Sequence, residues 1–308
     1  MSKIALKVDV DTLLGTQVGT PNLGKLFAEL GIRATFLFSL GPDHTGWALK
    51  RIFRPGFLKK VSRTSVLEHY GIKTLLYGVL LPGPDIGKRA ANEMRAIDQA
   101  GHETGIHTWD HVDWQDHVFK KDAAWTKAQM QKSWERFSNI FGHPPSTHGA
   151  AGWQMNLSAL QQIDAWEMAY ASDGRVSPRS IAHLTPYRVS LPSGPSKHVQ
   201  YPSTLPTLDE LIGVDGVDAD GAVQQLLSLT QNNPNDQVFT LHAELEGQKL
   251  LPAFKTLLLG WLNQGHELVT MQQLHQSWLA TKQLDKIANL SFAYGSIPNR
   301  SGELMIQN

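Results

Sequence analysis

The feature that most constrains the fold of this 308-residue chain is a repeated alternation of short apolar runs with longer segments of helical periodicity. The runs have the length of buried strands, and the segments between them are long enough for helices. Strands are expected at residues 4–10, 34–40, 102–107, 168–172, 198–203, 238–242 and 266–270. Helices are expected at residues 21–30, 86–100, 122–141, 222–229, 252–263 and 271–280. This order predicts a parallel α/β sheet, and the number of repeats favours a closed or nearly closed (β/α) barrel.

Two stretches interrupt the alternation. Residues 41–85 are too many for an ordinary loop and have their own apolar and basic content, so they predict an inserted helical segment after the second strand. Residues 283–308 are polar with little periodicity, which is typical of a wrapping or partly disordered tail. We therefore predict one barrel domain over residues 1–282, including the insertion, followed by a C-terminal tail.

Composition excludes several classes of protein. The 28 Lys and Arg balance 28 Asp and Glu, which argues against nucleic-acid binding because that function needs a basic excess. The chain has no cysteine, so disulfide bonds, thiolate catalysis and cysteine-ligated zinc are excluded. The N-terminal residues are too acidic for a signal peptide, and no apolar run has the length of a transmembrane helix. We expect a cytosolic protein that can still lie on a membrane.

Chemically competent side chains follow several of the predicted strands. They are Asp9, Asp11, His107, Asp173 and His242. In a parallel barrel the carboxyl ends of the strands share one face, which is where active sites are built. Convergence from separate strands therefore predicts a single site.

Two histidines near one of these strand ends have the spacing of metal ligands. His107 and His111 are four residues apart, so on a helical turn both imidazoles would lie on one side and reach one ion. The chain has 13 histidines, and a surface or capping pair is the alternative. A carboxylate from another strand would complete a site that suits Zn²⁺, Co²⁺, Mn²⁺ or Fe²⁺.

Asp9 and Asp11 alternate along the first strand and so are expected to face the same way. One carboxylate could bind the metal while the other acts as a base on the attacking water. The alternative is an acidic pair that caps a helix or makes a turn. It is weakened because burial of two acids within an apolar strand is costly unless something pairs with them.

His242 ends another apolar strand, where it could act as a general acid or be a hydrogen-bonded core histidine. Glu244 and Glu246 follow it closely. They are either substrate contacts or part of a solvated loop.

Taken together, the motifs resemble the polysaccharide deacetylase family. They occur in the family's order along most of the chain, as Asp-x-Asp at residues 9–11, His-Thr-x-x-His at 107–111 and Leu-His at 241–242. The resemblance implies a distorted, TIM-like barrel of about seven strands. It also implies one divalent metal ion on Asp11, His107 and His111, with Asp9 as general base and His242 as general acid.

The resemblance is strongest to one branch of the family, which removes the formyl group of 4-deoxy-4-formamido-L-arabinose-phosphoundecaprenol. The similar segments are residues 9–12, 15–16, 38–43, 105–111, 150–153, 172–175, 204–210 and 242–247. This branch implies a lipid-linked aminosugar (polyprenyl phosphate) substrate and hydrolysis to formate and the free amine. It further implies lipid A modification, resistance to cationic antimicrobial peptides, and a peripheral location on the cytoplasmic face of the bacterial inner membrane.

The same resemblance suggests substrate-binding or tuning roles for Trp109, Asp173, Arg175, Glu244 and Glu246. The family's Arg-x-Pro-x-Gly segment, whose arginine orients the catalytic aspartate, is replaced here by residues 147–153, which contain no arginine. We therefore hypothesise that Arg175 takes over this role beside Asp9.

Residues 46–63 carry six basic and no acidic residues, interleaved with bulky apolar ones. Such a segment could lie in the headgroups of an anionic membrane, where each charge contributes about 1 kcal/mol. The expected membrane-facing residues are Trp47, Lys50, Arg51, Phe53, Arg54, Phe57, Lys59, Lys60 and Arg63. The alternative is a lid helix with solvated charges, and a polyprenyl-phosphate substrate favours the membrane.

Other functions remain open at this stage. A polysaccharide or other aminosugar N-deacetylase would use the same site but is expected to be secreted. A hydrolase of a small soluble amide would not need the basic and aromatic insertion. An inactive carbohydrate-binding barrel is disfavoured, because all the expected catalytic and ligand positions carry competent residues.

Overall fold

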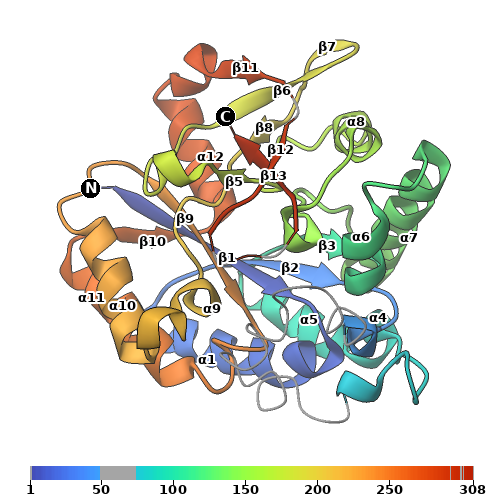
Figure 1. Cartoon of the computed structure of the whole chain (residues 1–308), viewed down its shortest axis with the longest axis horizontal. Coiled ribbons are helices and arrows are strands. Elements are labelled where there is room, and N and C mark those ends of the chain that lie inside the picture. The colour runs from blue at the N-terminus through green and yellow to red at the C-terminus, as the bar shows by residue number, and fades with distance from the viewer. Residues whose placement is uncertain (1, 49–73, 292, 299, 301, 308) are drawn as a thin grey trace.

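The computed structural model describes residues 2–48, 74–291, 293–298, 300 and 302–307. Figure 1 shows parallel strands at the centre and helices around them. Strand β1 (Lys3–Val10) pairs with β9 (Gln237–His242) and with β2 (Thr35–Ser39), and β2 pairs with β3 (Glu103–Thr108), all in parallel. Strand β10 (Glu267–Val269) pairs in parallel with the first residues of β1.

Short segments close the ring between β3 and β9. Ile106 of β3 forms a parallel bridge to His148, whose carbonyl accepts from the Ser172 amide. Strand β4 (Tyr170–Ala171) pairs in parallel with β8 (Val199–Gln200), and the Thr204 amide then donates to Val238 of β9. The ring therefore runs through β1, β2, β3, residues 147–149, β4, β8 and β9, and the predicted distorted barrel is confirmed.

Helices pack around the ring, and most of them begin and end at residues that the sequence marks. They are α1 (Thr20–Leu30), α4 (Ile86–Arg89), α5 (Ala91–Gln99), α6 (His111–His117), α7 (Ala123–Phe141), α8 (Leu157–Ala165), α9 (Leu208–Leu211), α10 (Ala219–Thr230), α11 (Leu251–Asn263) and α12 (Met271–Ala280). Asp122 caps α7 by accepting from the Trp125 amide, and Gly142 ends it at φ 78°. Between strands and helices the core is aromatic, with Phe27 edge-on to both Phe36 and Phe254.

Two details differ from the sequence-based expectation. The single helix expected over residues 86–100 is divided into α4 and α5, because Ala90 leaves helical geometry at φ −126°. Helices α6 and α8 and the antiparallel hairpin of β6 (Tyr187–Leu191) and β7 (Gly194–Pro195) were not expected. These elements are short, and short elements give weak periodic signals.

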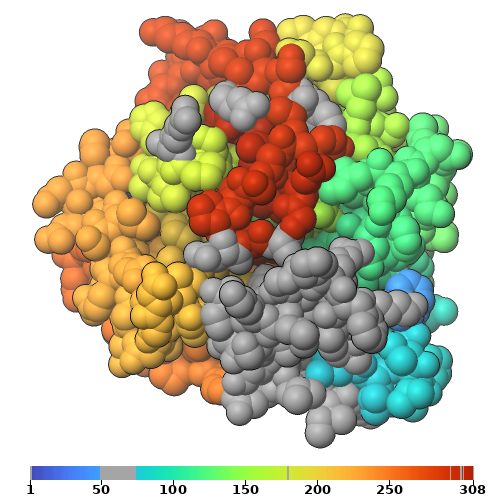
Figure 2. Space-filling view, viewed as in Figure 1, coloured from blue at the N-terminus to red at the C-terminus, as the bar shows by residue number. Residues whose placement is uncertain are grey.

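The described part of the C-terminal tail packs on the barrel. Strand β11 (Ala288–Leu290) pairs with β6, β12 (Tyr294–Gly295) pairs with β13 (Leu304–Gln307), and β13 pairs with β5 (Arg175–Val176). Leu304 and Met305 are buried. Figure 2 shows this red segment on the surface at the centre of the face in view.

Most of the expected membrane-facing residues lie outside the described residues. These are Lys50, Arg51, Phe53, Arg54, Phe57, Lys59, Lys60 and Arg63. Trp47 is described: its ring stacks on His44, and its Nε1 donates to the Gly78 carbonyl at 2.6 Å. Among the described helices, none combines the length and apolar character needed to cross a bilayer.

Candidate active site and metal centre

Three side chains from two strand ends and one helix start converge on a point that fits a metal ion. The Asp11 carboxylate lies between two imidazoles, with Oδ1 3.1 Å from His107 Nε2 and Oδ2 3.3 Å from His111 Nε2. One ligand atom from each residue lies within 4.8 Å of the others. Apart from this close approach to each other, Asp11 Oδ1 and His107 Nε2 are buried with no hydrogen-bond partner among the described residues, although buried polar atoms are normally paired. Two nitrogens and one carboxylate oxygen form a donor set that suits a divalent transition metal.

The expectation that the two histidines share one helical turn is wrong. His107 lies in β3, whereas His111 is the first residue of α6. Asp110 between them caps α6 by accepting from the Asp113 amide, so the chain turns sharply and brings the two rings to a 5.3 Å centroid distance. The Nδ1 of His107 donates to the Gly149 carbonyl at 2.6 Å, which leaves its Nε2 as a metal ligand.

The charges in this group support cation binding. Burial raises the pKa of Asp11, but His111 and His107 outweigh it and hold that pKa below its usual range. Burial lowers the pKa of His107, whereas Asp9 and Asp11 raise it above its ordinary value. The carboxylates and imidazoles therefore stabilise one another, and a cation would find ionised carboxylate in place.

Glu244 holds the strand end that presents Asp11. Its Oε1 accepts from the Asp11 amide at 3.0 Å, and from the Thr12 amide and hydroxyl at 2.8 Å each. A Cβ at Gly15 would lie 1.9 Å from the same oxygen, so only glycine leaves room for it. Burial and the Asp11 charge raise the pKa of Glu244 well above its ordinary value. These contacts suit positioning of a ligand rather than contact with substrate.

Glu244→Ala is expected to weaken both folding and metal binding. It leaves three buried donors without an acceptor, at a cost of about 1–3 kcal/mol for each unsatisfied group. Urea unfolding and a metal-competition titration measure the two effects. Glu267→Ala is the matched control, because Glu267 is 55% exposed in an ion pair with Lys3. Equal stability and equal metal affinity in Glu244→Ala and the control would contradict this role.

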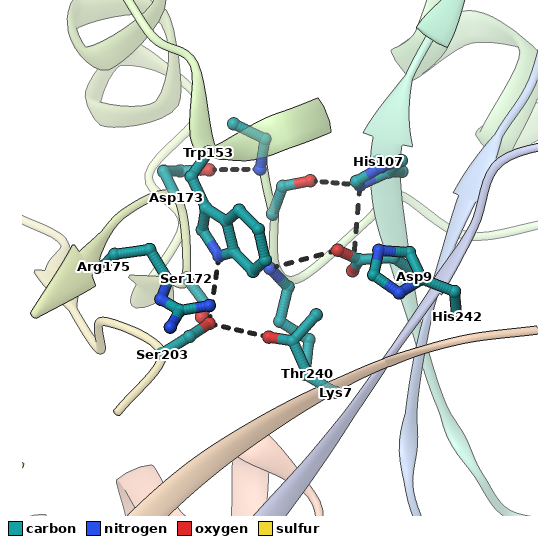
Figure 3. A network of polar contacts seen from close by, with 12 residues as sticks. Lys7, Asp9, His107, Trp153, Ser172, Asp173, Arg175, Ser203, Thr240 and His242 are labelled. Atoms are coloured by element: carbon teal, nitrogen blue, oxygen red, sulfur yellow. Dashed lines mark hydrogen bonds and ion pairs between the residues drawn. The ribbon is translucent and has the colours of Figure 1, made fainter. Parts of the chain in front are cut away.

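Asp9 lies beside the metal group, and its two oxygens have different surroundings (Figure 3). Oδ2 is 3.4 Å from Lys7 Nζ. Oδ1 is 3.8 Å from His107 Nδ1 and has no hydrogen-bond partner among the described residues. Sequence reasoning missed Lys7, although a charged residue two positions before Asp9 in an apolar strand was a visible signal. Side chains at that spacing share a face of a strand.

The expected contact between Arg175 and Asp9 is replaced by other pairs. Both terminal nitrogens of Arg175 donate to Glu210, at 3.1 Å each. The guanidinium lies 4.7 Å from the centre of the Trp153 ring, which in Figure 3 separates it from Asp9. Lys7 therefore occupies the place beside Asp9 that we had expected Arg175 to take.

His242 lies opposite Asp9 on the neighbouring strand. The parallel register of β1 and β9 pairs these two residues directly. Asp209 Oδ1 lies 3.9 Å from His242 Nδ1, and the His242 amide donates to Glu246 at 2.8 Å. Strand pairing therefore puts a carboxylate and an imidazole side by side at the edge of the metal group.

The buried carboxyl group of Glu246 is expected to make the free energy of unfolding depend on pH. Burial raises the pKa of its carboxyl to about 7, against the lowering effect of His242. Because this pKa is above the ordinary 4.5, the stability that Glu246 contributes is complete below about pH 4.5 and is lost as pH rises through about 7. The side chain of Glu246→Gln is neutral at both pH values. At pH 8 we therefore expect a higher melting temperature than in the wild type, by about 2–4 °C for each kcal/mol of unfolding free energy that the neutral side chain recovers. Differential scanning calorimetry at pH 5 and pH 8 tests this, and equal melting temperatures at pH 8 would count against it.

Asp173 and Trp109 lie around the site rather than in the metal group. Asp173 is fully buried and accepts from His148 Nδ1 at 2.6 Å, from the Ala150 amide at 2.9 Å and from Gln200. Burial raises its pKa, but His148 holds it below the ordinary value. The contacts fix the chain at residues 148–150, which includes the Gly149 carbonyl that orients His107. Trp109 packs under Arg136, whose guanidinium lies 5.1 Å from the ring centre.

Comparison with solved structures shows the class of fold. A Mycobacterium smegmatis protein described as a polysaccharide deacetylase superposes with a TM-score of 0.62 at 16% identity, over 96% of this chain and 95% of that one. An allantoinase superposes with a TM-score of 0.59 at 15% identity, over 91% of each chain. The chain thus has the α/β-barrel fold of these proteins.

Sequence comparison is more specific. The polysaccharide deacetylase family model matches residues 2–171, and the chain belongs to that family. Two relatives are each named probable 4-deoxy-4-formamido-L-arabinose-phosphoundecaprenol deformylase. The Shewanella sediminis protein is 34% identical over 94% of this chain and 91% of its own length. The Wigglesworthia glossinidia brevipalpis protein is 30% identical over 96% and 98%. The resemblance inferred from the motifs is confirmed.

Proposed function

We propose that this chain is a metal-dependent deformylase that hydrolyses the formamide of 4-deoxy-4-formamido-L-arabinose-phosphoundecaprenol to formate and the free amine. The observation that carries the proposal is the pairing of Asp9 with His242 across two strands, next to the group of Asp11, His107 and His111. The choice of substrate is supported by the names of two relatives that match nearly the whole chain.

Asp11, His107 and His111 would hold the metal. A bound divalent ion supplies a water of lowered pKa and a Lewis acid for the formyl oxygen. Zn²⁺, Co²⁺, Mn²⁺ and Fe²⁺ all accept two imidazoles and one carboxylate, so the ligands do not select among them.

Asp9 and His242 divide the proton transfers. Asp9 Oδ1 has no hydrogen-bond partner in the described part of the chain, so it is placed to take a proton from the attacking water as the water oxygen bonds to the formyl carbon. His242 gives a proton to the sugar nitrogen as the C–N bond breaks. The products are formate and the amine, and each of the two residues returns to its starting state by proton exchange with solvent.

The substrate lipid requires access from a membrane. We propose that the chain binds the cytoplasmic face of the bacterial inner membrane peripherally and that the amine it produces serves lipid A modification and resistance to cationic antimicrobial peptides. The support is the basic and aromatic composition of residues 46–63 together with the lipid-linked substrate.

Neutralising three of these charges, as Lys50→Gln, Arg51→Gln and Arg54→Gln, is expected to reduce binding to anionic vesicles, because each charge contributes about 1 kcal/mol. Flotation with vesicles that contain anionic lipid, compared with purely zwitterionic ones, measures the effect. Equal recovery of the wild type and the triple variant would contradict the membrane role.

The experiment that tests this function compares the removal of two different acyl groups from the same lipid-linked aminosugar. With metal supplied, we expect rapid formate release from the N-formyl substrate and slower acetate release from its N-acetyl analogue. Faster release of acetate from N-acetylated glycans would favour the deacetylase alternative. If neither formate nor acetate is released, the result would favour an inactive carbohydrate-binding barrel.

A further inference from the structure

We propose that Lys7 is a positioning residue for Asp9: it holds one carboxylate oxygen and leaves the other for the attacking water. The inference rests on the proposed function, in which Asp9 is the base. The charge of Lys7 also keeps Asp9 out of the coordination shell of the metal.

Lys7 is a buried basic residue whose ion-pair partner among the described residues is Asp9. Its side chain is fully buried in the middle of β1, and Nζ lies 3.4 Å from Asp9 Oδ2. Apart from that carboxylate, Nζ has no hydrogen-bond partner among the described residues. A buried charge is costly unless it is paired, so the ion pair constrains both side chains.

The end of the Lys7 side chain is enclosed by neighbouring residues. Its Nζ lies 5.4 Å from the centre of the Trp153 ring, within the range of a cation–π contact. Trp153 is itself fixed, because Nε1 donates to Ser203 Oγ at 3.0 Å and that oxygen contacts Thr240 at 2.7 Å. The backbone at Gly149 is also close, because a Cβ there would lie 2.8 Å from Lys7 Cε. The lysine therefore occupies a fitted slot and not a loose cavity.

This arrangement separates the two oxygens of Asp9. Oδ2 faces Lys7, whereas Oδ1 is near His107 and has no hydrogen-bond partner among the described residues. Asp9 is two residues before Asp11, and both carboxylates lie beside His107, at 3.8 Å and 3.1 Å, so a carboxylate without Lys7 would be drawn to the cation at Asp11. The ion pair offsets this attraction and preserves a base beside the metal instead of an additional ligand.

The test uses three variants of the full chain. Lys7→Met keeps the length of the side chain without its charge, and Lys7→Arg keeps the charge. Lys3→Met is the matched control, because Lys3 is in the same strand and also pairs with a carboxylate, Glu267 at 3.3 Å, at a partly exposed position. The readouts are kcat and KM for formate release and the dissociation constant for Zn²⁺ from chelator competition.

We expect Lys7→Met to lower kcat about 10²-fold, the size of an impaired proton transfer, with little change in KM. It should bind Zn²⁺ at least as tightly as the wild type, because a positive charge near the ion is gone and Asp9 can become a ligand. Lys7→Arg should recover most of the rate, and Lys3→Met should match the wild type. If Lys7→Met folds poorly, the proposal is tested instead by the Zn²⁺ affinity and kcat of Lys7→Arg.

Unchanged kcat in Lys7→Met would overturn the proposal, as would weaker Zn²⁺ binding that accounts for the lost rate. Lys7→Arg with kcat as low as that of Lys7→Met would also overturn it. A wild-type chain that releases no formate would instead refute the proposed function. The Zn²⁺ affinities of the variants would then still decide whether Lys7 keeps Asp9 off the metal.

Discussion

Asp9→Asn is expected to lower the rate of formate release by about 10²–10⁴-fold while the protein keeps its metal. The amide has nearly the shape of the carboxylate but cannot accept the proton of the attacking water. Asp9 is 3% exposed, so bulk water does not readily replace it as the base. Steady-state kinetics and the metal content of the same preparation measure the two parts of the result.

Asp220→Asn is the control for this substitution, since Asp220 is exposed on α10. It should have the rate of the wild type. Near-full turnover in Asp9→Asn with metal bound would show that another group is the base. Loss of the metal would show that Asp9 is a ligand.

Asp11→Ala is expected to abolish both metal binding and formate release. The Asp11 carboxylate contacts both imidazoles, at 3.1 and 3.3 Å, and removing it leaves two nitrogens without the central anion. A ligand that binds only the folded state raises its stability. Metal should therefore raise the melting temperature of the wild type and leave that of Asp11→Ala unchanged.

Chelation and re-addition of metal complete this experiment. The chelated wild type should lose activity and recover it with added Zn²⁺ or Co²⁺, whereas Asp11→Ala should stay inactive at every metal concentration. A variant with a full complement of metal, or with activity restored by metal, would contradict the assignment of Asp11.

Much of the fold could be predicted from local patterns. The strand at residues 4–10 and the helix at 271–280 have strong periodicity or clear caps, and they form β1 and α12 with nearly the expected bounds. The metal group could be anticipated for a topological reason. Parallel strands bring their carboxyl ends together, so Asp11 and His107 were expected near one another although they are far apart in the chain.

The rest depended on packing that no local pattern contains. Residues 147–149 are too short for periodicity, and only their backbone contacts to neighbouring strands identify them as part of the barrel. Arg175 was expected at Asp9, but its partner is Glu210, which lies 35 residues further along the chain. Lys7 was passed over because one lysine in an apolar strand does not reveal whether its head reaches solvent or a buried acid.

The most direct test of the account is an anomalous diffraction measurement on crystals of the metal-loaded protein. It should show one ion bonded at about 2.0–2.2 Å to an Asp11 oxygen and to Nε2 of His107 and His111. Asp9 should lie outside this shell, paired with Lys7 and within hydrogen-bonding reach of the water on the ion. An ion bound elsewhere, or one ligated directly by Asp9, would contradict the account.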